Sequence, residues 1–299
     1  MTDRPRPKNC TQYGNIEDRM RMFETFHKLK TLPNTWTVLR IDGRCFSTYT
    51  QKYAKPFDLC FHENMCLAAM RTAENLDAVL AYVQSDEVSI LLPKTGTAIF
   101  DGEVEKLVSV SASLMSANFT ALSKDIVSFD SRVISLPSWK NVVDYFIWRH
   151  NDALRNSLYT HAYWALRASG ESQRAATKQL LGQPRSGQNE ILFRLGINFN
   201  DVPVWTKRGS MVVSTSYFKD GFNPLTKQAV KVQRKELRIY HEIPTRSQYN
   251  NLITAIADKG CVTAEEVATW ASVDRQEEEH LPSRVEWKVN HIPTQKGRN

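Results

Sequence analysis

Long apolar runs are missing from this chain of 299 residues. No stretch approaches the roughly 20 apolar residues that a membrane-spanning helix needs, which argues against an integral membrane protein. The opening segment, residues 1–8, lacks the apolar core of a secretory signal, so we expect a cytoplasmic protein. Internal repeats, low-complexity tracts and coiled-coil heptads are absent from the sequence as well.

Cysteine is scarce, and no two cysteines have the spacing of a recognisable pair. The five cysteines are Cys10, Cys45, Cys60, Cys66 and Cys261. An odd count, with no C-x-x-C pair and no His-rich neighbour, disfavours both a disulfide framework and a structural zinc site. We expect Cys60 and Cys66 to lie on one helix as small buried groups.

Acidic residues are outnumbered by basic ones. The 32 Asp and Glu face 39 Lys and Arg, which leaves a formal net charge of +7. A basic surplus is compatible with a polyanionic partner such as RNA, because Lys and Arg neutralise phosphates and release counterions. A merely soluble basic protein is an equally good interpretation, so the charge alone does not decide the partner.

The first half of the chain alternates strands and helices. We expect a charged helix over 16–32 and a strand over 36–41 that ends at Asp42 and Gly43. A helix over 59–76, strands over 78–83 and 88–92, a helix over about 103–122 and a strand over 128–135 follow. The order β-α-β-β-α-β predicts an α+β fold like a polymerase palm, an antiparallel sheet with both helices packed on one face.

The second half is expected to extend this palm. We predict helices over 138–169, 171–181 and 188–195, a break at 182–187, a loop over 198–204 and a short strand over 207–214. A helix over 264–272 precedes a basic tail. The sequence therefore divides into a flexible start (1–14), a palm-type catalytic domain with a helical extension (15–217) and a C-terminal region of open role (218–299).

Two acidic clusters stand where predicted strands end, at Arg40–Arg44 and Gln84–Glu87. The second cluster separates two strands so closely that it must lie at a tight hairpin turn. In this strand order the hairpin neighbours the first strand, so Asp42 can approach Asp86. Two carboxylates plus substrate phosphates suffice to hold Mg²⁺, and Gly43 leaves room for a carbonyl or a phosphate. Taken singly, each cluster is more typical of an ordinary turn.

A series of motifs is similar to that of the tRNA(His) guanylyltransferase superfamily. The motifs are Asp18–Met20, Arg40–Arg44, Ala54–Asp58, Gln84–Glu87, Phe129–Arg132, Trp148–Ser157, Gly196–Pro203 and Lys207–Gly209. They run in unbroken order over about residues 10–215, and such an ordered set is far more specific than any single motif. Residues after about 220 match nothing in this pattern.

The resemblance implies a template-dependent enzyme that adds nucleotides to the 5′ end of tRNA. ATP and GTP or other nucleoside triphosphates are then substrates, and the assembly is a homo-tetramer built from dimers. Asp42, Asp86 and Glu87 become the catalytic carboxylates, with two Mg²⁺ ions held by Asp42, the Gly43 carbonyl and Asp86. Glu87 can instead point away along its strand.

The resemblance also assigns contacts to the nucleotides and the RNA. The nucleotide-binding positions are Arg44, Lys55, Asp58, Ser85, Lys106, Asp130 and Arg132. The positions for RNA or a second nucleotide are Arg149, Asp152, Asn156, Lys207 and Arg208. Purely structural roles stay open as alternatives. Lys106 can be a solvated charge, Asp130 can pair with Arg132, and the polar stripe of Arg149, Asp152 and Asn156 on one helix face can be a buried salt-bridge network.

One position departs from the eukaryotic pattern His-Ile-Asn-Asn-Leu-Tyr. The corresponding segment here, Leu154–Tyr159, has leucine in place of that histidine. This brings the chain closer to bacterial and phage-type guanylyltransferase-like proteins, which resemble enzymes that repair truncated tRNA 5′ ends by Watson–Crick pairing. Two other functions stay open, a nucleotide cyclase or signalling-nucleotide synthase on the same palm and a non-catalytic RNA-binding protein.

Overall fold

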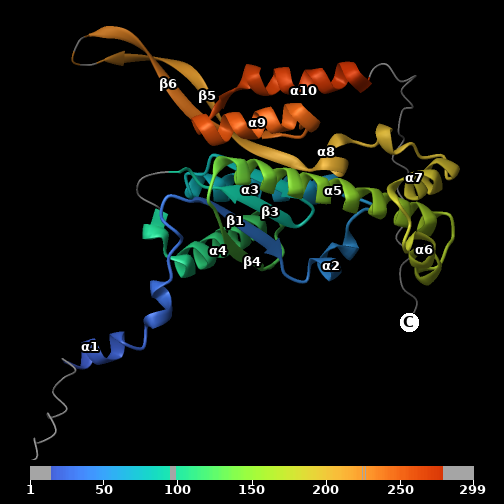
Figure 1. Cartoon of the computed structure of the whole chain (residues 1–299), viewed down its shortest axis with the longest axis horizontal. Coiled ribbons are helices and arrows are strands. Elements are labelled where there is room, and N and C mark those ends of the chain that lie inside the picture. The colour runs from blue at the N-terminus through green and yellow to red at the C-terminus, as the bar shows by residue number, and fades with distance from the viewer. Residues whose placement is uncertain (1–14, 95–98, 224, 226, 279–299) are drawn as a thin grey trace, which may run out of the picture.

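A computed structural model of the chain describes residues 15–94, 99–223, 225 and 227–278 (Figure 1). Its sheet has the strand order β4-β1-β3-β2-β5-β6, and β7 pairs with β5 in parallel. The strands are β1 (Trp36–Gly43), β2 (Leu80–Gln84), β3 (Glu87–Leu91), β4 (Phe129–Leu136), β5 (Ser210–Asn223), β6 (Gln228–Tyr240) and β7 (Val262–Thr263). The helices are α1 (Ile16–Arg21), α2 (Phe46–Tyr49), α3 (Leu59–Asn75), α4 (Val104–Ser123), α5 (Trp139–Ala168), α6 (Gln173–Leu180), α7 (Arg185–Arg194), α8 (Val204–Arg208), α9 (Arg246–Lys259) and α10 (Ala264–Glu278).

The predicted β-α-β-β-α-β palm is confirmed by the order β1, α3, β2, β3, α4, β4. Helices α3 and α4 pack on the same face of the sheet. Alternate strand residues face these helices, because successive side chains of a strand point to opposite sides. Leu39 and Ile41 of β1 and Val88 and Ile90 of β3 are therefore completely buried in one core with α3 and α4.

The opposite face of the sheet is covered as well, by α5 and α9. Val38 and Leu80 lie in a second core with Phe146 of α5 and Tyr249 of α9. The Tyr249 hydroxyl also donates to the Phe146 carbonyl at 3.3 Å, which ties the two helices together. The near-continuous apolar run of β2 reflects this burial on both faces.

The far end of α5 forms a third, smaller core with α6 and α7. Leu158, Ala162 and Leu166 of α5 pack there against Leu180 and Leu192. Helix α7 begins at Arg185, inside the predicted break at 182–187. Across the part of the chain that the structure describes, no helix combines the length and the apolar character that a membrane crossing needs.

Three local predictions are wrong. The segment predicted as one helix over 16–32 holds only the short α1 and a 3-10 turn, Thr25–Lys28. All of α1 is exposed and it lies apart from the sheet (Figure 1), so among the described residues no apolar contact stabilises a longer helix. Lys207 and Arg208 end α8 rather than begin a strand, and Cys60 is exposed rather than buried. The predicted flexible start, 1–14, lies outside the described residues.

Strands β5 and β6 form a long hairpin that extends beyond the body of the molecule (Figure 1). Only the first part of β5, Ser210–Val213, pairs with β2. Thr215 and Ser216 pair with β7 as well as β6, whereas among the described strands the outer part, from Tyr217 on, pairs with β6 alone and exposes large apolar groups such as Phe218 and Phe222. The predicted division after residue 217 therefore falls inside β5.

Gly209 lies between α8 and β5 and provides a test of how closely the start of β5 packs against β2. Its φ is +76°, and a Cβ there would lie 2.3 Å from the Val83 carbonyl oxygen of β2. Gly182 has a similar φ of +72° but open space around it. Gly182→Ala should lower the free energy of unfolding by about 1–2 kcal/mol, the cost of a left-handed alanine. Gly209→Ala should lower it by about 1–3 kcal/mol more, because the added carbon meets backbone.

Urea unfolding followed by circular dichroism measures both variants of this pair. Equal losses for Gly182→Ala and Gly209→Ala would show that β5 can move away from β2 at no cost.

Candidate active site

The sheet brings Asp42 and Asp86 together. Asp86 and Ser85 form the two-residue turn of the β2–β3 hairpin, where Ser85 has a φ of +54°. In the register between β1 and β3, Asp42 stands opposite Glu87, the residue after the turn. The Gly43 N–H then donates to the Asp86 carbonyl at 3.1 Å. Sheet hydrogen bonds thus fix both carboxylates at one end of β1.

The electrostatics of this pair favour a cation. Burial, together with the nearby Asp42 carboxylate, raises the pKa of Asp86 to about 6. No basic side chain of the described part of the chain forms an ion pair with Asp42 or Asp86. Two crowded carboxylates without a protein cation offer the hard oxygen donors that Mg²⁺ prefers. The residues present therefore fit a divalent metal.

Packing around Gly43 leaves no room for a side chain at this position. A Cβ at this position would lie 2.4–2.9 Å from ring carbons of Phe46. Phe46 is buried and stacks among Phe61, Phe119 and Phe129. The glycine thus lets the aromatic core close directly beneath the end of β1, which positions the loop that follows Asp42.

Glu87 lies between two arginines. Its carboxylate oxygens are 2.6 Å from Arg40 Nη2 and 2.7 Å from Arg149 Nε. Burial raises the pKa of Glu87, and the charges of Arg149 and Arg40 oppose this rise. Both oxygens of Glu87 therefore already face a guanidinium group, an arrangement that joins β1, β3 and α5.

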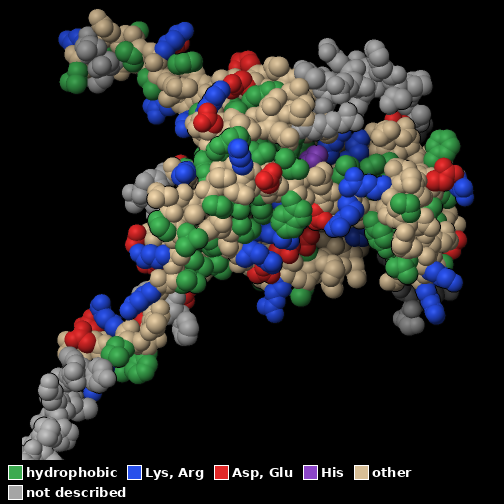
Figure 2. All heavy atoms as spheres, in the orientation of Figure 1, with side chains coloured by type: hydrophobic (Ala, Val, Ile, Leu, Met, Phe, Trp, Pro, Cys, Tyr) green, Lys and Arg blue, Asp and Glu red, His purple; other side chains and the backbone are tan. Residues whose placement is uncertain are grey.

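The polar stripe of α5 continues this network. Arg149 Nη2 donates to Asp152 Oδ2 at 3.0 Å, and Asn156 Nδ2 donates to the same oxygen at 3.3 Å. Arg155 pairs with the other oxygen of Asp152, and the Arg149 guanidinium lies 4.6 Å from the ring centroid of Trp148. Figure 2 shows acidic and basic side chains gathered beside α5. The stripe is a salt-bridge network at the edge of the site.

A cavity of about 190 Å³ opens beside the hairpin turn. Its walls are aromatic, and they come from Tyr53, Phe57, Phe61, Trp164 and Trp205. The hairpin contributes polar groups from Gln84 and Ser85. Aromatic walls with a few polar groups suit a flat heteroaromatic ring, because such a ring stacks on its faces and forms hydrogen bonds at its edge.

Three of the predicted nucleotide contacts, Lys55, Asp58 and Ser85, line this cavity. Lys55 Nζ donates to the Thr50 carbonyl at 2.7 Å, and burial lowers the pKa of Lys55. Asp58 caps the start of α3: it accepts from the Phe61 N–H at 2.8 Å and from the Ala54 N–H at 3.1 Å. Asp58 therefore shapes the loop that forms the cavity.

The other predicted nucleotide contacts are exposed and do not line the cavity. Arg44 is exposed, and Lys106 is exposed and pairs with Glu103 at 3.0 Å. Asp130 and Arg132, both exposed, lie 3.5 Å apart, which matches their structural alternative.

Lys207 and Arg208 are not brought to an open surface together. Lys207 is only 5% exposed, and its amine donates to the Asn200 carbonyl at 2.6 Å. The partly buried Arg208 lies 3.5 Å from the Ile243 carbonyl through Nη1. In the described part of the chain Lys207 is buried and bonded to backbone, and its contact with RNA stays a prediction.

The aromatic walls of the cavity and the ion pair of Arg40 were not predicted from the sequence. Aromatic residues are dense in 49–61 and in 159–164, and this density was the signal for a stacking pocket. Arg40 interrupts an otherwise apolar strand, which indicates a buried partner such as Glu87.

The palm sheet, the carboxylate pair at a strand end and the neighbouring cavity are the features of a nucleotidyltransferase, and the relatives of this chain are nucleotidyltransferases. Two family models match the chain: tRNAHis guanylyltransferase over residues 17–137 and the Thg1 C terminal domain over residues 140–291. The chain belongs to the tRNA(His) guanylyltransferase family.

Named relatives and solved structures agree with this assignment. The tRNA(His) guanylyltransferase of Neurospora crassa is 39% identical over 197 residues, 60% of this chain and 67% of that protein. That of Saccharomyces cerevisiae is 34% identical over 214 residues, 64% of this chain and 87% of that protein.

Among solved structures, a bacterial guanylyltransferase-like protein in complex with ATP has a TM-score of 0.66 at 31% identity. That likeness covers 81% of this chain and 98% of the bacterial one. The Saccharomyces cerevisiae enzyme has a TM-score of 0.61 at 32% identity, covering 65% and 91% of the two chains.

The raised pKa of Asp86 yields a test of the metal site. The folded protein favours the protonated carboxyl, so without metal this contribution to stability is fully present below about pH 4 and is lost as the pH rises through about 6. Asp86→Asn should therefore raise the free energy of unfolding at pH 7.5 in EDTA by about 2 kcal/mol.

Thermal unfolding at several pH values, with and without Mg²⁺, measures this effect. Mg²⁺ should raise the melting temperature of the wild type but not that of Asp86→Asn. Asp130→Asn, at the exposed carboxylate opposite Asp42, should behave as wild type. An Asp86→Asn variant that is no more stable in EDTA at pH 7.5 would contradict the geometry.

The arginine network yields a second test. Arg149→Leu leaves the buried Glu87 with Arg40 alone and should lower the free energy of unfolding by about 3 kcal/mol. Arg155→Leu removes an exposed pair to Asp152 and should cost less than about 1 kcal/mol. Denaturant titration compares the two variants, and similar losses would mean that Arg149 has no special role.

Proposed function

We propose that this chain adds nucleotides to the 5′ end of tRNA, in the 3′–5′ direction and directed by a template. The named relatives are tRNA(His) guanylyltransferases, and solved relatives hold ATP or GTP. Membership of the family supports a tRNA substrate and nucleoside triphosphates as the donors.

One observation carries the proposal: the Asp42–Asp86 pair stands beside the aromatic cavity. Asp86 and Ser85 occupy the same turn, and Ser85 lines the cavity. A nucleotide whose base stacks between the walls therefore has its phosphates within reach of the carboxylates. This juxtaposition is what phosphoryl transfer needs, since positioning and charge neutralisation provide most of the catalysis.

The residues have separate roles in this proposal. Asp42, Asp86 and the Gly43 carbonyl would hold Mg²⁺, which would supply Lewis acidity and lower the pKa of an attacking hydroxyl. Trp164 and Phe57 stack the base, and the Lys55 ammonium, close to the Trp164 ring, offers a positive charge to phosphate. Glu87 and Arg149 hold the hairpin against α5.

The chemistry consists of two balanced displacements. A 5′-monophosphate oxygen attacks the α-phosphorus of ATP and expels pyrophosphate, which leaves an adenylylated 5′ end. The 3′-hydroxyl of the incoming nucleotide then attacks the 5′ phosphorus, loses its proton and expels AMP. A 5′-triphosphate end reaches the second step directly.

We further propose repair of truncated 5′ ends rather than strict tRNA(His) maturation. Leu154 stands where the eukaryotic pattern has histidine, and it packs against the apolar cluster of α5, α6 and α7. An apolar side chain at this position cannot donate a hydrogen bond to RNA. Base pairing with the opposite strand then selects the incoming nucleotide.

A primer-extension assay tests the function. Purified protein is incubated with Mg²⁺, ATP, the four nucleoside triphosphates and 5′-labelled tRNA that lacks one or more 5′ nucleotides. The wild type should restore the paired end, and Asp42→Ala should slow extension at least about a thousandfold, equivalent to roughly 4 kcal/mol of transition-state stabilisation. Asp144→Ala, which removes an exposed carboxylate on α5, is the matched control and should extend tRNA as the wild type does.

The outcomes separate the candidate functions. Equal extension by wild type and Asp42→Ala, or no extension of any tRNA, refutes the proposal. A cyclic product from a nucleoside triphosphate alone would identify a cyclase on the same palm. Addition of G to full-length tRNA(His) without extension of truncated tRNAs would refute the repair assignment alone.

A further inference from the structure

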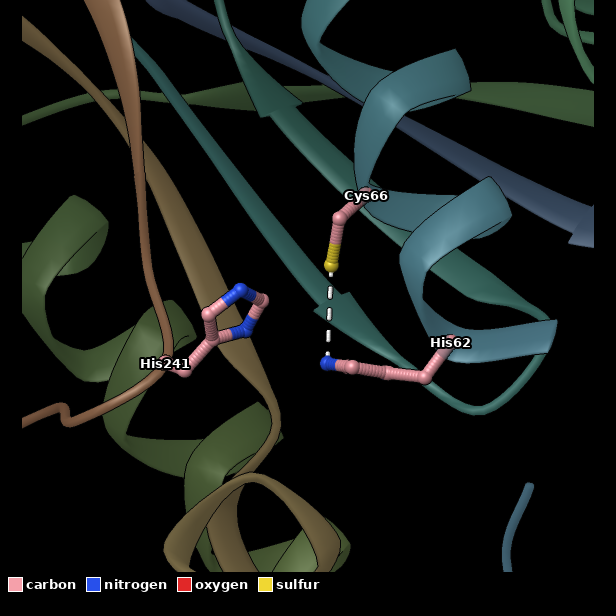
Figure 3. Close-up of side chains that lie close together, drawn as sticks. All are labelled: His62, Cys66 and His241. Carbon is pink, nitrogen blue, oxygen red and sulfur yellow. Dashed lines mark hydrogen bonds between the residues drawn. The ribbon is translucent and has the colours of Figure 1, made fainter. Parts of the chain in front are cut away.

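A second set of metal-ligating side chains lies behind the cavity wall, apart from the carboxylates. We propose that His62, Cys66 and His241 bind a Zn²⁺ ion. One ligand atom from each of the three residues lies within 4.8 Å of the other two. Figure 3 shows the thiol and the two imidazole rings converging, with His62 and Cys66 on α3 and His241 on the loop after β6.

The first pair already has the spacing of a zinc site. His62 and Cys66 lie one helical turn apart, on the same face of α3. Cys66 Sγ is 3.5 Å from His62 Nε2. Zn–S bonds of about 2.3 Å and Zn–N bonds of about 2.0–2.1 Å place tetrahedral ligands about 3.5 Å apart. Both atoms can therefore bind one ion without a change in α3.

His241 is oriented for the third bond. Its Nε2 faces the Glu63 carboxylate at 3.5 Å, and its Nδ1 faces the cluster, 2.9 Å from Ser210 Oγ. A carboxylate behind the second ring nitrogen is the usual arrangement of a metal-bound histidine, because it fixes the tautomer and the ring plane. Glu63 thus favours the tautomer in which Nδ1 carries the lone pair, and that nitrogen faces Ser210 Oγ inside the cluster.

Burial and charge fit the same ion. His62 is 4% exposed, and Cys66 and Ser210 are completely buried, in a place where apolar side chains are the default. Zinc binding releases the thiol proton to solvent, and the resulting thiolate together with Glu63 balances the two positive charges. Ser210 Oγ, 2.7 Å from His62 Nε2, or a water fills the fourth position. Thiolate and imidazole select Zn²⁺, whereas the Asp42–Asp86 oxygens select Mg²⁺.

Zinc is disfavoured by the sequence only as long as cysteine pairs and local His-rich stretches are taken as its signals. Cys66 needs no second cysteine if two histidines complete the set. The spacing His62-x-x-x-Cys66 was visible, but His241 is distant in the chain and comes close only through the pairing of β5 with β2 and β6.

The ion would stabilise one wall of the nucleotide cavity. His62 lines that cavity, and its ring stacks on Trp205 with centroids 4.6 Å apart. Zinc would join α3, the first residue of β5 and the β6–α9 loop at this wall. Its occupancy would then set how firmly His62 and Trp205 are held against a bound base.

Metal analysis of the tag-free, full-length protein tests the site. Inductively coupled plasma mass spectrometry after incubation with Zn²⁺ and dialysis should find about one zinc ion per chain. Replacement with Co²⁺ should give a thiolate-to-cobalt charge-transfer band. Cys66→Ser and His241→Gln should each lower bound zinc at least tenfold, and Cys66→Ser should abolish the band.

Cys60→Ser is the matched control, since Cys60 is an exposed cysteine on the same helix. It should keep the zinc and the cobalt band. If Cys66→Ser does not fold, the zinc content of His241→Gln, on the partly exposed loop, still tests the proposal. Asp42→Ala should retain zinc, which separates this site from the proposed catalysis. A wild type without bound zinc and without the cobalt band, or equal zinc in Cys66→Ser and Cys60→Ser, would mean a hydrogen-bonded cluster only.

Discussion

The tight turn at Ser85 and Asp86 is the constraint on which the site depends. β3 pairs with β1 from Val38–Leu91 to Asp42–Glu87, so the sheet register sets how far the turn reaches. A slip of one residue would send Asp42 to the face covered by α3 and α4 and would bury its charge. The Gly43 N–H bond to the Asp86 carbonyl closes the arrangement. Two carboxylates that repel each other are thus held together by backbone hydrogen bonds.

The palm and the carboxylate pair could be predicted because their signals are local. The largely apolar run Val38–Ile41 indicates a strand that is buried on both faces. The short acidic interruption at Gln84–Glu87 indicates a hairpin turn. The order of elements then places Asp42 beside Asp86. The same reasoning failed at 16–32, where the apolar residues of α1 are exposed and have no partner in the described structure.

The partners of several polar groups could not be predicted from the sequence, although the Asp130–Arg132 pair and the network at Arg149 stood among its alternatives. Asp58 accepts hydrogen bonds from two backbone N–H groups, and the Lys207 amine donates to the Asn200 carbonyl. Glu87 forms ion pairs with Arg40 and Arg149. Each partner is set by the way segments pack in three dimensions, and residue type alone does not reveal it. The aromatic cavity is similar, because Tyr53 and Trp164 meet only through the packing of α5.

The position of β5 has a consequence for how the molecule folds. This strand completes the palm sheet beside β2, and its Met211 and Val213 belong to the core shared with α5 and α9. The cavity likewise takes walls from both matched regions, such as Tyr53 from the first and Trp205 from the second. Neither region can therefore bury its apolar surface alone. The two regions that the family models separate form one cooperative unit, so a gene fragment encoding the first would yield an incomplete sheet with an open edge.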